Sequence, residues 1–530
     1  MTQRVYSLSQ REHLKLIAGL SFILGLAIAV PAHQGYIALP PIIELLGPVV
    51  IPTLIMVAIW QIIRRSPLPC LHPAILVGGY FALTYGIGAI VMYNFAHFPF
   101  EAHPEYQELF THIREQLPNA SVFSLVGILG VICGATIWPS RTRRTGTQAH
   151  DSDMMPKIRK AYYWALPFIA GASFALTFLK VPILLAYYLG AASELAGFGF
   201  FFAGFETSRS GLLKSKWLVY IACEAATIAT TGMRDGARGP VLRPIVLFCI
   251  GIMIQRRKVP KKLVAICFTM ALLAMPFLNA VKSSLATGID FEQSVDAASS
   301  ATHGQTIHSA VEELALTIAG RVTFYPMHLA MYANLWPSIY PFEHGQTLVW
   351  AIEGLVPRFV DPNKENQMEK FDSLPRQAGI IAATDYRTSA SPDAFSEYYL
   401  NFGVLGIFLL SILHGLYFNI LHRFLVIRNK DLFQLAVYAY LTLVAFPDTT
   451  VFRRFSGDSR YLLLWGAFYL FLIRSSNEKR IRRVLPGTVD RKIPCAQDVN
   501  LSARGVARYD PAEMGGKEEI QDGAQLAENG

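Results

Sequence analysis

Residues 121–139 read SVFSLVGILGVICGATIWP and contain no charged side chain. A helix of this length can cross a hydrocarbon core about 30 Å thick, because each helical residue adds about 1.5 Å. Three arginines, Arg141, Arg143 and Arg144, follow the segment directly. The stretch therefore predicts a transmembrane helix that runs into a basic loop.

Similar apolar segments recur from Leu14 to about Ile473. Of the 530 residues, 52% are hydrophobic and 16% are charged, whereas a soluble domain carries about a quarter charged residues. Long runs of strict alternation are missing, which argues against a membrane β-barrel. We therefore predict an all-α polytopic integral membrane protein of about twelve transmembrane helices. They are placed near residues 14–32, 41–63, 72–95, 121–139, 161–179, 183–205, 217–232, 240–255, 262–280, 395–420, 432–447 and 461–474.

The orientation follows from the basic residues of the short loops, since Lys and Arg mark the cytoplasmic side of a membrane protein. Basic loops alternate along the chain with loops that hold almost no basic residues. This alternation predicts that both termini are cytoplasmic. The predicted inside loops carry Arg64 and Arg65, then Arg141 to Lys160, Arg209 to Lys216, Arg256 to Lys262, and Arg423 to Lys430.

Four parts follow from this topology. Residues 1–280 carry helices 1–9, 281–394 form a large outside loop with amphipathic helices, and 395–474 carry helices 10–12. Residues 475–530 are polar and are expected to form a disordered cytoplasmic tail. A thirteenth span over Ile307–Leu335 is the alternative for part of the loop, although its charged residues make that costly. The cysteines lack metal-ligand spacing, and no metal or other cofactor is predicted.

Among the predicted helices that begin at the outside face, three start near Pro240, Pro392 and Arg460, and polar residues crowd the start of each. A helix N-terminus presents unpaired N–H groups and a partial positive charge. It therefore suits a phosphate or another anion.

The first of these starts reads TGMRDGARGPVLR over residues 231–243. Its glycines permit a tight backbone whose N–H groups point one way, and Arg234, Arg238 and Arg243 supply fixed positive charge. We interpret it as an anion site. The alternative is a structural loop in which Asp235 pairs with a neighbouring arginine.

Two further basic clusters lie in predicted outside loops. The second cluster comprises Arg358, Lys364, Arg376 and Arg387. The third comprises Arg453, Arg454 and Arg460. The competing interpretation of both is solvated surface charge, since nearby aspartates can neutralise the second cluster locally.

Three motifs occur in a recognisable order. They are residues 234–240 at the start of a span, LVPR at 355–358 followed by Lys364, and SPDAFSEYYLNFGVLG at 391–406 leading into another span. In this order, and with a large outside loop between spans, the chain resembles the bacterial polysaccharide repeat-unit polymerases of the O-antigen and exopolysaccharide type. The resemblance covers about residues 200–474.

The resemblance implies a metal-independent glycosyltransferase of the bacterial inner membrane, with a large periplasmic loop between helices 9 and 10. It implies transfer of the growing polysaccharide from undecaprenyl diphosphate to a newly flipped lipid-linked repeat unit. The expected partners are this lipid-linked oligosaccharide, membrane lipids, a chain-length regulator and a flippase, and no nucleic acid is expected.

The leaving diphosphate gains negative charge in this reaction, which preorganised arginines can stabilise. Arg238 and Arg358 are therefore predicted to be catalytic. Glu397, a candidate base, is the third predicted catalytic residue. The remaining basic residues of the three clusters are predicted to bind diphosphate or sugar: Arg234, Arg243, Lys364, Arg376, Arg387, Arg453, Arg454 and Arg460. The base for the acceptor hydroxyl stays open among Glu397, Asp393 and four loop histidines: His303, His308, His328 and His344.

Two other functions remain open at this stage. An O-antigen ligase is similar in layout and uses a histidine of the large loop, of which four are available. A flippase or transporter for the lipid-linked sugar belongs to another class, and it requires paired charges deep in several spans together with internal repeats. The chain shows no clear repeat, and most charge lies at the outside face.

Overall fold

The computed structural model describes residues 8–35, 41–64, 69–94, 107–138, 155–164, 183–224, 239–256, 323–355, 367–380, 392–428, 432–444, 462–463 and 465–470, with single positions at 262, 265, 269 and 293. All of them belong to the compact unit Met1–Arg474, and the second unit, Ser475–Gly530, lies outside the described residues. The described residues form helices and no strand, which confirms the all-α class.

Five described helices are long and apolar enough to span a membrane: Ser9–His33, Glu44–Ile63, Pro73–Tyr93, Gln116–Thr136 and Ala394–Ile427. Each coincides with a span predicted from hydropathy. The shorter apolar helices Pro244–Arg256 and Leu432–Thr442 overlap two further predicted spans, 240–255 and 432–447. The total of about twelve and the position of the large loop stay predictions.

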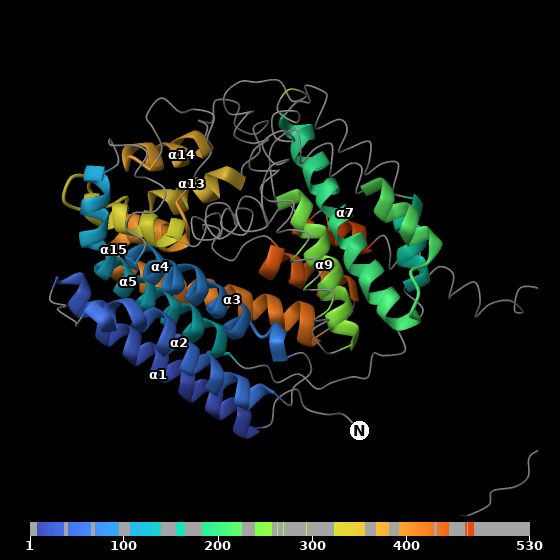
Figure 1. Ribbon diagram of the computed structural model, residues 1–530, viewed down its shortest axis with the longest axis horizontal. Coiled ribbons are helices and arrows are strands. Elements are labelled where there is room, and N and C mark those ends of the chain that lie inside the picture. The colour runs from blue at the N-terminus through green and yellow to red at the C-terminus, as the bar shows by residue number, and fades with distance from the viewer. Residues whose placement is uncertain are drawn as a thin grey trace, which may run out of the picture. The chain divides into compact units, whose positions relative to one another are not determined.

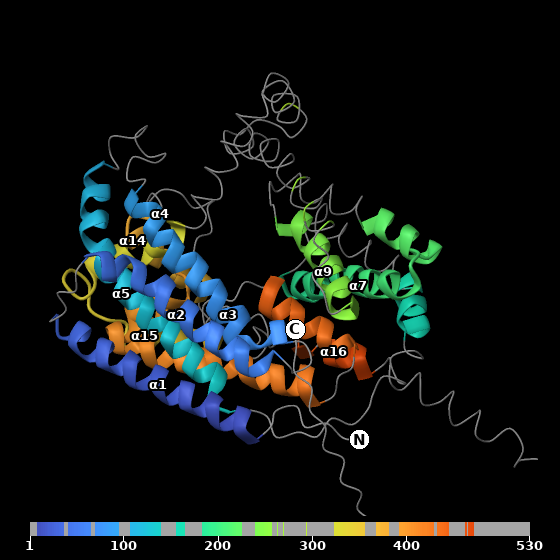
Figure 2. The same cartoon turned by 60° about the horizontal axis from the view of Figure 1, so that its bottom comes forward.

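The five spans belong to the following elements. α1 covers Leu8–His33, α2 covers Pro41–Ile63, and α5 covers Gln107–Thr136. α3 (Pro73–Phe81) continues through the π-helical η2 (Ala82–Ile87) into α4 (Gly88–Asn94). α15 (Ala394–Leu421) continues into the π-helical η5 (His422–Arg428). Figure 1 and Figure 2 show α1, α2, α5 and α15 side by side, and the contacts between these helices agree.

α5 and α15 approach each other through residues with almost no side chain. A Cβ atom built on Gly134 would lie 2.0 Å from the Ile412 carbonyl oxygen, and one on Gly415 would lie 2.1 Å from the Val131 carbonyl oxygen. Small residues spaced four apart let transmembrane helices pack backbone to backbone, where dispersion replaces the missing hydrophobic effect. Gly130 with Gly134 and Ser411 with Gly415 follow this spacing.

α7 (Ile183–Ser210) and α9 (Gly239–Arg256) pack in the same way, because a Cβ on Gly204 or Gly251 would lie within 2.2 Å of a carbonyl oxygen of the other helix. A hydrophobic cluster rich in aromatic residues surrounds this pair and includes residues of α16 (Leu432–Ala439) and the π-helical η6 (Tyr440–Val444). Its fully buried members include Phe198, Trp217, Tyr220 and Trp465.

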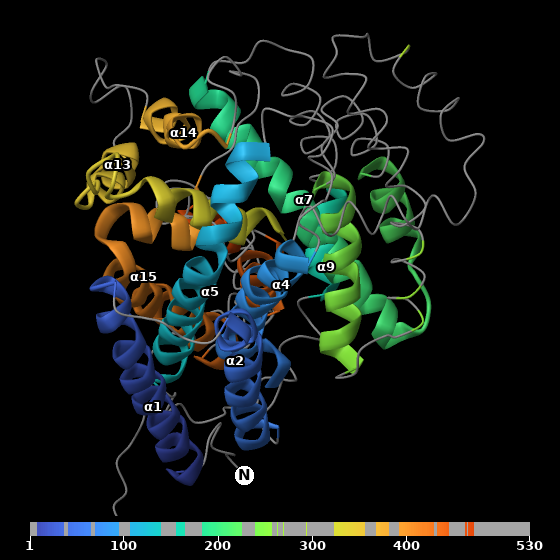
Figure 3. The same ribbon diagram turned by 60° about the vertical axis from the view of Figure 1, so that its left-hand side comes forward.

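Within the described part of the predicted outside loop lie three helices: residues 323–335, α13 (Gln346–Leu355) and α14 (Gln367–Gln377). Figure 3 shows α13 and α14 near one end of α15. The helix over residues 323–335 buries Leu329 and Tyr332 in the same hydrophobic cluster as α15. Its sequence range overlaps the segment for which amphipathic helices were predicted.

A buried ion cluster lies at the end of α7, one residue beyond the predicted span 183–205. Glu206 accepts hydrogen bonds from Arg159 and from the Trp217 indole N–H, the latter at 2.7 Å, and its carboxylate lies 2.7 Å from Lys214 Nζ. Burial alone would raise the pKa of Glu206, but the hydrogen bonds from Lys214, Trp217 and Arg159 bring it below its ordinary value. The carboxylate therefore holds three segments of the chain together.

Replacing Glu206 with glutamine should lower the melting temperature of the purified protein at pH 7, because two cations lose their counter-charge and such hydrogen bonds contribute about 1.5–3 kcal/mol each. Since the folded state lowers the pKa of Glu206, this stabilisation is present above the ordinary Glu pKa of about 4.3 and is lost as the pH falls further. Thermal unfolding in detergent at pH 7 and pH 4 measures it. Glu12→Gln, which breaks an exposed pair with Lys15, is the control and should change little.

Candidate functional site

α15 is broken one third of the way along its length. Phe402 (φ −144°, ψ 17°) and Gly403 (φ 65°, ψ −153°) leave helical geometry, so the first two turns form a separate half-helix. The interruption frees backbone carbonyls, and those of Leu400 and Asn401 accept hydrogen bonds from the N–H groups of Glu343 (2.9 Å) and His344 (3.1 Å). Only glycine adopts the backbone angles of Gly403 without strain.

The segment whose N–H groups bind these carbonyls, residues 343–347, also accepts a hydrogen bond from a side chain of α15. Asn401 Nδ2 donates to Thr347 Oγ1 of α13 at 2.7 Å and to the Glu397 carbonyl at 2.8 Å. Asn401 is fully buried, and its Oδ1 has no hydrogen-bond donor among the described residues. The break in α15 is thus the point at which residues 343–347 attach to the spans.

Asp393 caps the N-terminus of α15. Its carboxylate accepts hydrogen bonds from Ser396 N (3.1 Å), Ser396 Oγ (2.7 Å) and the Tyr85 hydroxyl. Tyr85 lies in η2, where the π-helical turn interrupts the regular backbone of a span. A carboxylate at this position satisfies orphan N–H groups and complements the helix dipole. Asp393, which the sequence offered as a candidate base, is therefore the N-cap of α15.

His328 lies beside this cap in the helix over residues 323–335. Its Nδ1 is 3.9 Å from Asp393 Oδ2, which is too long for a hydrogen bond. Burial lowers the pKa of His328 to about 3, so the ring is neutral at pH 7 and forms no ion pair with the carboxylate. Neither ring nitrogen has a hydrogen-bond partner among the described residues, and the ring lies against Phe324 with centroids 3.7 Å apart.

Glu397 lies one turn after Asp393, and its backbone N–H donates to the Asp393 carbonyl at 2.9 Å. Its side chain is fully buried in the first turn of α15. A carboxylate in the first turn of a helix is favoured by the partial positive charge there. Among the predicted catalytic residues, Glu397 is the one whose side chain the structure describes.

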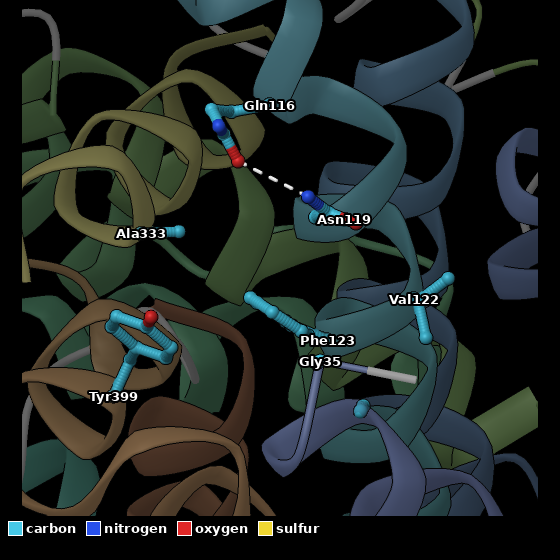
Figure 4. Close-up of a pocket in the computed structure, with 8 residues that line it drawn as sticks. Gly35, Gln116, Asn119, Val122, Phe123, Ala333 and Tyr399 are labelled. Atoms are coloured by element: carbon cyan, nitrogen blue, oxygen red, sulfur yellow. Dashed lines mark hydrogen bonds between the residues drawn. The ribbon is translucent and has the colours of Figure 1, made fainter. Parts of the chain in front are cut away.

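A pocket of about 230 Å³ opens between the C-terminal end of α1, α5, the helix over residues 323–335 and α15 (Figure 4). Figure 4 shows the amides of Gln116 and Asn119 on one side of it and the Tyr399 ring on the other, with Phe123 between them. Asn119 Nδ2 donates to Gln116 Oε1 at 3.1 Å. The lining residues are Ala32, Gly35, Gln116, Asn119, Val122, Phe123, Ala333 and Tyr399.

The basic residues predicted to bind the diphosphate are mostly not described. Arg243 is a residue of α9, although its side chain is not described, and Arg376 lies half-buried in the last turn of α14. Outside the described residues lie Arg234, Arg238, Arg358, Lys364, Arg387, Arg453, Arg454 and Arg460.

Several side chains of the site carry no individual signal in the sequence. Tyr85 is an ordinary aromatic residue of a span, and Thr347 lies within a loop helix. Gln116 and Asn119 immediately precede the span predicted over residues 121–139. The sequence analysis did not single out these two amides, and their place next to the outside end of a span is the one pattern that could have pointed to this region. Among the described residues, no three His, Cys, Asp or Glu side chains are grouped as metal ligands.

A search of curated proteins and a search of solved structures each find no significant match. A family model described as O-antigen polysaccharide polymerase Wzy matches residues 74–476 of the 530 residues, which includes the cap and the break of α15. Because the match covers well over half of the chain, the protein belongs to the O-antigen polysaccharide polymerase (Wzy) family.

Proposed function

We propose that this protein polymerises lipid-linked oligosaccharide repeat units on the periplasmic face of the bacterial inner membrane, with both termini in the cytoplasm. The growing polysaccharide is transferred from undecaprenyl diphosphate to the newly delivered repeat unit. The observation that carries this proposal is the family match over residues 74–476. The polar cap and break of α15 lie at the end of the span that the basic-loop pattern assigns to the periplasm.

The transfer breaks the bond between the anomeric carbon and the diphosphate oxygen, and the diphosphate leaves with the electron pair. A hydroxyl oxygen of the acceptor sugar forms the new bond to the anomeric carbon and loses its proton to a base. The sugar passes through an oxocarbenium-like transition state while negative charge grows on the diphosphate. Fixed positive charge at the diphosphate and a base at the acceptor therefore suffice, without a metal ion.

Arg238 and Arg358 supply the positive charge in this proposal, and the other residues of the three basic clusters bind diphosphate and sugar. The guanidinium group binds two phosphate oxygens at once and stays charged at every physiological pH. Arg238 directly precedes Gly239, the first residue of α9, and in this proposal the arginine and the N–H groups of the helix N-terminus bind the same anion.

Glu397 is the proposed base. Its position in the first turn of α15, beside a cap of fixed geometry, supports this role because a base requires a defined orientation. Asp393 is already bound to Ser396 and Tyr85, which leaves it the positioning role. Since the Glu397 side chain is fully buried, this role requires the packing around it to open when the acceptor binds.

A strain that lacks the protein tests this function against its alternatives. The expected phenotype is accumulation of single lipid-linked repeat units in the periplasmic leaflet and absence of long polymer. Polymer that accumulates on the lipid carrier without its final acceptor indicates a ligase. Repeat units confined to the cytoplasmic leaflet indicate a flippase. Leaflet location is measured by accessibility of the saccharide to a lectin in intact spheroplasts.

Replacing Arg238 with alanine should lower polymer output about a hundredfold, because loss of one donor to a developing anion costs about 3 kcal/mol in the transition state. Arg238→Lys should restore only part of the polymer output, since the point charge of an ammonium group does not reproduce the planar guanidinium group. Polymer is quantified by gel at matched protein levels in the membrane. Arg209→Ala, in the predicted cytoplasmic loop, is the control, and near-normal polymer from Arg238→Ala contradicts the role.

A further inference from the structure

We infer that the pocket between α1, α5, the helix over residues 323–335 and α15 binds one uncharged sugar residue of the repeat unit, as a positioning subsite distinct from the reacting sugar. This inference rests on the proposed function for the source of the sugar. It assigns a role to Gln116, Asn119, Phe123 and Tyr399, none of which takes part in the proposed chemistry.

The size and charge of the pocket select the ligand class. Its volume is about 230 Å³, below the range of about 300–1,000 Å³ that holds drug-sized ligands, so it accommodates a single ring and not a whole oligosaccharide. None of the eight lining residues is ionisable apart from the phenol of Tyr399. A diphosphate requires cations, so the pocket fits a neutral sugar ring and not the carrier.

Two side-chain amides provide the hydrogen bonds. Each amide has two N–H donors and a carbonyl oxygen with two lone pairs, and the single bond between Asn119 Nδ2 and Gln116 Oε1 uses one donor and one lone pair. The remaining donors and acceptors lie next to each other at the pocket. Adjacent hydroxyl groups of a pyranose both donate and accept, so they match this arrangement. Asn119 is exposed and Gln116 half-buried, so both amides are accessible to a ligand.

Two aromatic rings form the apolar part. Phe123 and Tyr399 stack with centroids 5.4 Å apart and an interplanar angle of 19°. The Tyr399 hydroxyl donates to the Trp336 carbonyl at 2.9 Å, which fixes the ring and directs the hydroxyl toward protein. The C–H faces of a pyranose pack on such a rigid ring while its hydroxyl groups bond to the amides. Pockets that bind small ligands combine apolar walls with a few polar groups in this manner.

The position along α15 separates this pocket from the proposed base. Tyr399 and Glu397 are two residues apart in the same half-helix, and successive helical residues turn by about 100°. Their side chains therefore leave the helix in nearly opposite directions. A sugar on Tyr399 is not the one whose hydroxyl reaches Glu397, and its binding should affect the affinity for the repeat unit more than the rate of transfer.

The test compares the wild-type protein with the double variant Gln116→Ala/Asn119→Ala and with Phe123→Leu, all as the full chain in lipid nanodiscs. Saturation-transfer NMR is recorded with glucose, galactose, mannose, rhamnose, N-acetylglucosamine and N-acetylgalactosamine in turn. At least one sugar should give a signal with the wild type, and both variants should weaken its binding at least fivefold. Two control variants should bind the sugar as the wild type does. Tyr399→Phe keeps the aromatic ring, and Gln377→Ala removes an exposed amide of α14.

Polymerisation of purified lipid-linked repeat units in proteoliposomes gives the second readout. KM for the repeat unit should rise at least fivefold in the double variant, while kcat changes less than twofold. Binding equal to wild type in both pocket variants, or no signal from any sugar, overturns the inference. If sugar binding depends on the pocket but the wild type makes no polymer, the subsite stands and the proposed polymerase function fails.

Discussion

The Glu397→Gln variant should make polymer about a hundredfold more slowly than the wild type, or slower still, since general base catalysis contributes about 10²–10⁴ in rate. Glutamine keeps the size of the side chain and its carbonyl oxygen but cannot take a proton. Because Glu397 is fully buried, an isosteric change is the one that perturbs the packing least. The initial rate is measured in proteoliposomes with purified lipid-linked repeat units.

Two comparisons separate a base from a structural residue in this experiment. Glu397→Asp keeps the carboxylate but shortens its reach, and it should recover part of the rate. The melting temperature of Glu397→Gln should stay close to the wild-type value. A Glu397→Gln protein that polymerises at a near-normal rate removes Glu397 from the mechanism, whereas a large fall in melting temperature assigns it to the fold.

The Gly134→Leu variant should fail to accumulate as folded protein in the membrane. Even the first added carbon would lie 2.0 Å from the Ile412 carbonyl oxygen and 2.7 Å from the Leu416 backbone nitrogen. Both atoms belong to a helix backbone, so relief requires α5 and α15 to separate. Overpacking usually costs about 1–3 kcal/mol and more where the neighbour cannot move. Tagged protein in the membrane fraction and its melting temperature in detergent are the measurements.

Gly19→Leu is the matched control. Gly19 also lies inside a membrane span, but a Cβ built on it meets nothing within 4 Å, and the residue is exposed on α1. Replacement there removes a flexible helix residue without a clash, so the protein should accumulate normally. Equal amounts of the Gly134→Leu and Gly19→Leu proteins would show that α5 and α15 do not pack as closely as described.

Hydropathy was sufficient to predict the spans that the structure describes. A helix in lipid satisfies its backbone internally and needs an apolar surface, and both conditions are local properties of about twenty residues. The order of the motifs 234–240, 355–358 and 391–406 was likewise enough to indicate the family that the match confirms. The assignment of the three arginine-rich clusters to a diphosphate site remains a prediction.

The sequence predicted only part of the structure at the start and the break of α15. The polar residues before the span at 395–420 marked a helix start, and Asp393 indeed caps it. Asn401-Phe402-Gly403 was part of a recognised motif, but the sequence did not show that the helix breaks there. The break is stabilised by hydrogen bonds from the N–H groups of Glu343 and His344 to backbone carbonyls, and every sequence has such carbonyls. Hydrogen bonds between backbone groups leave no signature in the side chains of the residues that form them.

The partners of the site were decided by packing alone. Tyr85 and Asp393 are 308 residues apart, and they meet because α3, η2 and α15 are brought together around buried aromatic residues. The pocket forms because four helices leave a space that Phe123 and Tyr399 do not fill. Membrane spans follow from the transfer of one segment from water to lipid, whereas a site requires several segments to meet, and no single segment specifies its neighbours.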